Sequence, residues 1–138
     1  MRLLIFGGRA YADWAAFCQA MEKYRGAEQS LTIIHGGATG ADAMGEKWGL
    51  IYRTGLERFA ADWKDLSHPD AVISHRKSGS YDMLAGFRRN QQMIDEGKPD
   101  RALECPGGSG TADMHRRLVR AGIPIEYVVK KPIAGLFD

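Results

Sequence analysis

Residues 31–42 read LTIIHGGATGAD and pass from an apolar run through a glycine turn into the start of a helix. The apolar run over 31–34 predicts a strand that is covered on both faces. A helix is expected from about Thr39, where Thr39 and Asp42 have the spacing of a capping box. A strand that leads through glycines into a helix is typical of α/β folds built on a parallel sheet.

The same succession occurs at two other places in the chain. Leu3–Phe6 ends at Gly7-Gly8, and Ala102–Cys105 ends at Pro106-Gly107-Gly108. Apolar periodicity adds helices at 14–24, 86–96 and 109–121, and short strands at 56–60 and 125–129. Strands that alternate with helices predict an α/β fold: one Rossmann-like, doubly wound domain with a mainly parallel five-stranded sheet and helices on both faces.

A chain of 138 residues has the length of one domain. We therefore predict a single domain over residues 1–138. Residues 62–81 show no clear periodicity and are predicted to form a long loop or lid, and residues 130–138 a tail. Loops of that length are usually functional or mobile.

The glycine turns are the candidate binding site. In the common strand order 3-2-1-4-5, these three turns lie at adjacent carboxyl ends, where such folds bind ligands. Glycine lets a ligand approach backbone N–H groups, and the helix that follows favours a phosphate or carboxylate. The candidate residues at the turns are Gly7, Gly8, Arg9, His35, Gly36, Gly37, Thr39, Gly40, Asp42, Pro106, Gly107, Gly108, Ser109, Gly110 and Thr111. The alternative is that the glycines only make tight turns.

Other candidates lie outside the turns. Arg89 and Asn90 begin a predicted helix, where an arginine opposes the helix dipole and so suggests a functional reason. Asp62 and Trp63 follow the third strand and suit a base or ribose, although a packed tryptophan is the simpler interpretation. Asp113 lies in a first helical turn, where the dipole favours a carboxylate with or without chemistry.

Composition excludes several classes of protein. Nineteen basic against seventeen acidic residues give a net charge of +2, which argues against DNA as a partner.

No apolar run approaches the roughly 20 residues of a membrane helix, so we expect no membrane association and a cytoplasmic location. Cys18 and Cys105 are expected to be reduced, and the histidines lack metal-ligand spacing. We expect no metal and no cofactor.

Five segments taken together resemble the YspA-like branch of the SLOG superfamily, which also contains the LOG phosphoribohydrolases and the Smf/DprA single-strand DNA-binding proteins. These segments are Gly7-Gly8-Arg9, residues 35–42, residues 60–63, residues 85–90 and residues 106–111. The resemblance spans about Leu3 to Val129. It implies a Rossmann-like domain that binds a nucleotide or a nucleotide-derived small molecule, as a sensor, carrier or sequestering protein. LOG relatives are dimers or larger, so the resemblance also suggests a homo-oligomer.

The resemblance leaves two alternative functions. LOG enzymes pair an arginine with a glutamate in P-G-G-x-G-T-x-x-E; here Arg89 is kept, but the glutamate position is Met114. Cleavage of a glycosidic bond needs a carboxylate, so an N-glycosidase or phosphoribohydrolase acting on nucleoside monophosphates or NAD/ADP-ribose derivatives would have to use another one. Asp113, with Arg89, is the catalytic candidate. The second alternative is single-strand DNA binding as in Smf/DprA. In the predicted loop, His68, His75, Arg76 and Lys77 are candidates for a lid over an anion.

Overall fold

A five-stranded parallel sheet forms the centre of the molecule. The computed structural model describes residues 1–76, 79–82 and 84–128. The sheet has the order β3-β2-β1-β6-β7, and every adjacent pair is parallel. Its strands are β1 (Arg2–Phe6), β2 (Thr32–His35), β3 (Gly55–Arg58), β6 (Arg101–Glu104) and β7 (Ile125–Tyr127). The predicted strand order is therefore confirmed, and β1 and β6 flank the point where the order reverses.

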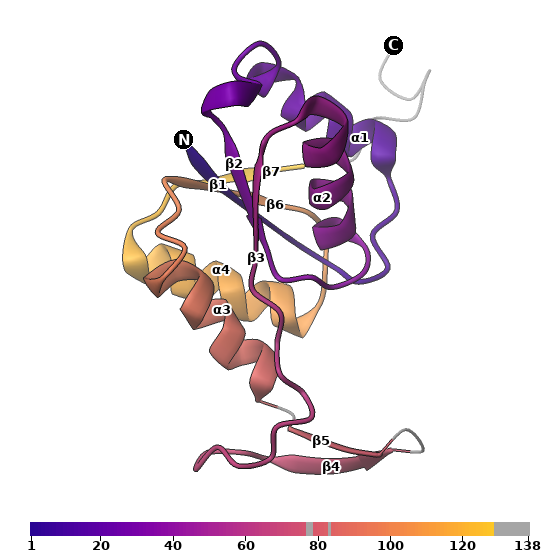
Figure 1. Cartoon of the computed structure of the whole chain (residues 1–138), viewed down its shortest axis with the longest axis vertical. Helices are drawn as coiled ribbons and strands as arrows, with labels where there is room; N and C mark the ends of the chain where they lie inside the picture. Colours follow the sequence, from indigo (N-terminus) through magenta and orange to yellow (C-terminus); the bar gives the residue numbers. More distant parts are fainter. Residues whose placement is uncertain (77–78, 83, 129–138) are drawn as a thin grey trace, which may run out of the picture.

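Helices cover both faces of this sheet (Figure 1). The helices are α1 (Trp14–Met21), α2 (Ala41–Tyr52), α3 (Ala85–Asp95) and α4 (Ser109–Ala121), with short 3₁₀ turns at Glu22–Tyr24 and Glu28–Ser30. Successive β1 side chains point to opposite faces. Leu3 and Ile5 pack into a core with α1 and α2, whereas Leu4 and Phe6 pack into a second core with α3 and α4. The predicted α/β class and its two-sided covering are confirmed.

The prediction of an irregular loop over residues 62–81 is wrong for its second half. An antiparallel hairpin forms there from β4 (Ile73–Arg76) and β5 (Gly79–Asp82). The hairpin projects from the main body at the bottom of Figure 1. Neither Ile73–Arg76 nor Gly79–Asp82 has the alternation of apolar and polar residues by which a strand is predicted from sequence. Lys77 and the predicted tail at 130–138 lie outside the described residues.

None of the helices in the described ranges has the length and apolar character needed to cross a membrane.

Candidate functional site

The three glycine turns border one cavity of about 590 Å³. It opens at the carboxyl ends of β1, β2 and β6, beside the switch point of the sheet. The candidate residues that line it are Gly7, Gly8, Arg9, Asp42, Trp63, Arg89, Asn90, Gly108, Ser109, Gly110 and Thr111. The candidates outside its lining are His35, Gly36, Gly37, Thr39, Gly40, Asp62, Pro106, Gly107 and Asp113. Several of this second group hold the turns in place.

Gly8 links the first turn to the other two. Its N–H donates to the carbonyl of Pro106 at 3.0 Å, and its carbonyl accepts from the N–H of Ala41 at 3.2 Å. A Cβ on Gly107 would lie 2.5 Å from Gly8 N, and one on Gly40 would lie 2.1 Å from Gly8 O. This approach of backbone to backbone therefore requires glycine at both positions.

The buried carboxylate of Asp42 accepts hydrogen bonds from the backbone of the second turn. Its Oδ2 accepts from the N–H groups of Gly36 at 3.0 Å and Ala38 at 3.2 Å, and the residue is only 5% exposed. Burial raises the pKa of the Asp42 carboxyl, against the opposing effect of those donors and of Arg89. The predicted capping box is wrong: the N-cap of α2 is Gly40, and the Thr39 hydroxyl donates instead to the carbonyl of Arg9 at 3.1 Å.

His35 supports the same turn from the end of β2. Its Nδ1 accepts from the N–H of Gly37 at 3.0 Å, which requires an unprotonated Nδ1. The ring is buried, and burial lowers the pKa of His35 below its ordinary value of 6.5. These contacts support a structural role for His35 in the turn.

Acid is therefore expected to destabilise the protein through His35. Below pH 6.5 the unfolded chain takes up a proton that the folded ring resists, so the free energy of unfolding decreases as pH falls toward the lower pKa of the folded state. Urea denaturation at about pH 7.5 and about pH 5 measures this loss. The variant His35→Gln cannot gain this proton and should lose less stability over the same interval. Equal losses in the two proteins would contradict the assignment.

Arg89 is a half-buried cation that faces the cavity. Its Nη1 donates to the carbonyls of Gly36 and, at 3.4 Å, Phe59, and its Nε donates to Asn90 Oδ1 at 3.3 Å. Among the described residues no carboxylate forms an ion pair with Arg89. Burial lowers the pKa of the guanidinium; the charge of Asp42 raises it and that of Arg9 lowers it. Backbone acceptors thus hold the guanidinium, and no carboxylate in the described part of the chain lies within ion-pair distance of it.

Arg9 and Trp63 form part of the cavity wall. The Arg9 guanidinium lies over the Trp63 ring, 5.2 Å from its centroid. The edge of the same ring lies against Gly86, where a Cβ would come within 2.7 Å of it. Trp63 therefore positions Arg9 beside the cavity by a cation–π contact.

Asp113 lies behind the wall of the cavity. Its Oδ2 accepts from Asn90 Nδ2 at 3.1 Å and from Arg117 Nε at 2.8 Å. Asn90 Nδ2 also donates to the carbonyl of Gly110 at 3.3 Å, so the amide ties α3 to the first turn of α4. Asp113 orients Asn90 in this arrangement and does not itself face the cavity.

The floor of the cavity is apolar. Phe6, Met93 and Met114 line it, and Met114, which occupies the position of the LOG glutamate, is 1% exposed. Asp42 is the carboxylate that lines the cavity within the described ranges, and its Oδ2 is engaged with its own turn. Cys105 directly precedes the third turn and is buried. Burial raises the pKa of its thiol to about 12, and this keeps the thiol unreactive.

Sequence reasoning missed several lining residues. They are Phe6, Ala38, Lys64, Gly86, Phe87 and Met93. Met93 follows Arg89 by one helical turn, and this spacing would have placed both on one face of α3. Lys64 carries no comparable signal. No cluster of three or more metal-ligating side chains is found in the described part of the chain.

Comparison with known proteins gives the family. Residues 1–65 match the model of the YAcAr family, described as the YspA, cpYpsA-related SLOG family. The chain is also similar to the Gene 61 protein of Mycobacterium phage D29, with 30% identity over 142 residues that cover 95% of this chain and 98% of the phage protein. No solved structure matches the chain significantly. The glycine turns and these matches lead to one conclusion: the chain belongs to the YspA, cpYpsA-related SLOG family.

Proposed function

We propose that the cavity binds a nucleotide or a nucleotide-derived phosphate ligand, and that the protein acts as a sensor, carrier or sequestering protein for it. The observation that carries this proposal is Arg89, a half-buried guanidinium on the cavity wall without an ion-pair partner among the described residues. Withdrawing a charge from water without an ion-pair partner is costly to a fold. A phosphate in the cavity would offset that cost, and arginine can bind phosphate through two donors.

The first turn of α4 supplies a second group of anion donors. Ser109, Gly110 and Thr111 line the cavity at the start of this helix. The first N–H groups of a helix lack partners within it and point toward any ligand at that end. The turn and Arg89 border the same cavity, so one phosphate can be shared between them.

The remaining wall suits the rest of a nucleotide. The cavity volume of about 590 Å³ lies within the range of small-molecule sites. Trp63, Phe87 and the apolar floor offer aromatic and aliphatic surface to a base. Binding without cleavage is favoured because Met114 takes the place of a carboxylate and Asp113 lies outside the lining.

A ligand panel tests the proposal by thermal unfolding. It comprises nucleoside monophosphates, ADP-ribose, cyclic ADP-ribose and NAD. A ligand at a hundred times its Kd should stabilise the protein by about 2.7 kcal/mol. For a domain of this size, that corresponds to a rise in Tm of several degrees. Adenosine serves as the matched control without phosphate and should give a much smaller shift.

The outcomes of this panel separate the candidate functions. No shift with any phosphate compound would contradict the proposal. Chromatography of the same mixtures detects free base, whose appearance would replace the binding function by the N-glycosidase alternative. An equal shift with adenosine and its monophosphate would show that the phosphate is not what is recognised.

A further inference from the structure

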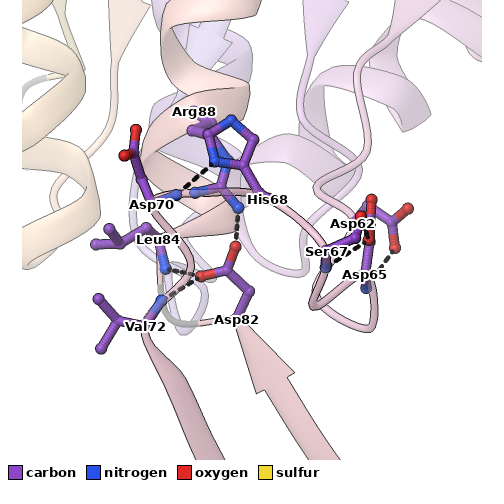
Figure 2. Close-up of polar contacts among 9 residues, drawn as sticks. All are labelled: Asp62, Asp65, Ser67, His68, Asp70, Val72, Asp82, Leu84 and Arg88. Atoms are coloured by element: carbon purple, nitrogen blue, oxygen red, sulfur yellow. Dashed lines mark hydrogen bonds and ion pairs between the residues drawn. The ribbon is translucent and has the colours of Figure 1, made fainter.

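Asp82, the last residue of β5, is a buried carboxylate outside the cavity. It has 0% exposure, and its Oδ1 accepts from the N–H groups of Val72 at 3.1 Å and Leu84 at 3.0 Å. Its Oδ2 forms an ion pair with Arg88 of α3 (Figure 2). These contacts join the base of the hairpin to the start of α3, which has no side-chain cap of its own.

The same residue is connected to the cavity wall in two directions. The backbone N–H of Asp82 donates to the carbonyl of Trp63 at 2.7 Å. The ring of Trp63 in turn makes the cation–π contact with Arg9. Its carboxylate holds Arg88, and the next residue of α3 is Arg89. Asp82 therefore contacts the two segments that present Trp63 and Arg89 to the cavity.

The free-energy cost of burying the Asp82 carboxylate suggests that it does more than stabilise the hairpin. A buried charge is tolerated only when it is paired and hydrogen-bonded, and it rarely adds net stability. A two-stranded hairpin that projects from the body is marginal by itself and gains a fixed base from Asp82. Of the groups that fix this base, the Leu84 N–H and Arg88 belong to the start of α3, whereas the Val72 N–H belongs to the segment before β4.

We infer that Asp82 is a positioning residue of the phosphate site. It fixes the orientation of Arg89 through α3 and that of Trp63 through its backbone, without touching the ligand. In this inference Asp82, at the end of the hairpin, supports the site from outside the cavity. This inference rests on the proposed function for its ligand, but the placement of Arg89 can be measured without one.

The variant Asp82→Asn tests the inference. It keeps the shape and one acceptor oxygen and removes the charge that faces Arg88. Calorimetric titration with adenosine 5′-monophosphate and with inorganic pyrophosphate should show binding about tenfold weaker than in the wild type. Asp70→Asn, an exposed carboxylate of the same segment, is the matched control and should bind as the wild type does. Unchanged affinity in Asp82→Asn would overturn the inference.

A readout without ligand separates this inference from the proposed function. Phenylglyoxal modifies accessible arginines, and mass spectrometry locates the product. In Asp82→Asn, Arg89 should react about tenfold faster than in the wild type, with exposed Arg120 as the internal reference. If the wild type binds neither probe, the proposed function fails while the reactivity of Arg89 still decides the role of Asp82. Equal reactivity in both proteins would refute that role.

A second pair of variants covers the case in which Asp82→Asn fails to fold. Arg88→Lys keeps the charge opposite Asp82, whereas Arg88→Gln removes it. The lysine variant should keep Arg89 protected, and the glutamine variant should expose it. If neither or both of the two variants expose Arg89, the ion pair does not position it, and the inference is wrong.

Discussion

Replacement of Arg89 by alanine is expected to weaken the binding of a phosphate-bearing nucleotide by about 100-fold. Hydrogen bonds to charged groups contribute about 1.5–3 kcal/mol each, and arginine can supply two to one phosphate. The side chain is already held by the carbonyls of Gly36 and Phe59, so little rotamer entropy is lost when the ligand binds. Isothermal titration with the ligand identified in the panel measures the change in Kd.

The fold should tolerate this substitution. Arg89→Ala removes two hydrogen bonds to backbone carbonyls, but it also removes a half-buried cation that has no ion-pair partner within the described ranges. These effects oppose each other, so the free energy of unfolding should change by only about 1 kcal/mol. Loss of binding would then report the site and not unfolding.

Two further variants define the chemistry at Arg89. Arg89→Lys keeps the charge but loses the planar pair of donors, and should bind with intermediate affinity. Arg120→Ala removes an exposed arginine in the last turn of α4, far from the N-terminal end that lines the cavity, and should leave Kd unchanged. If Arg89→Ala binds as tightly as Arg120→Ala, the phosphate lies elsewhere.

Gly40→Ala is expected to have the largest effect on stability, a loss of about 3 kcal/mol. Gly40 has a φ of +73° and a ψ of −123°, a conformation that costs other residues about 1–3 kcal/mol. Its new Cβ would lie 2.1 Å from Gly8 O and 2.6 Å from the carbonyl carbon of Arg9. Both are backbone atoms, so the first and second turns must move apart. Urea denaturation measures the loss.

Two glycines provide matched controls for this experiment. Gly26 has a φ of +93°, and a Cβ added there would meet no atom within 4 Å, so Gly26→Ala isolates backbone strain. Gly110 lies in α4 with open space around it, so Gly110→Ala should be neutral or stabilise the helix by up to about 1 kcal/mol. If Gly40→Ala costs no more than Gly26→Ala, the contact between the turns is not tight.

The strands and glycine turns that surround the site can be predicted from the sequence, because the patterns that indicate them are local. Apolar runs that end in Gly-Gly define β1 and β6 together with their turns, and the alternation with helices gives the parallel sheet and its order. That order predicts a binding cavity at the carboxyl ends of the strands.

The contacts that each residue of the candidate site makes could not be predicted in the same way. Thr39 and Gly40 belong to a glycine turn, yet the first donates to Arg9 O and the second allows the turns to approach each other. Asp82 lies in a segment without periodicity, and its role depends on Arg88 and on the carbonyl of Trp63. Such contacts join residues that are distant in the sequence, and no local pattern encodes them.

The junction at Gly8 also has a consequence for the order of assembly. Its partners lie at Ala41 and Pro106, so the candidate site draws on the first tenth of the chain and on its last third. Contacts over such separations form late in folding, because the intervening chain must first lose its freedom. A nascent chain that stops short of Pro106 has β1 and β2 but no closed junction. If the proposed ligand binds there, affinity for it would therefore require a chain that extends beyond Pro106.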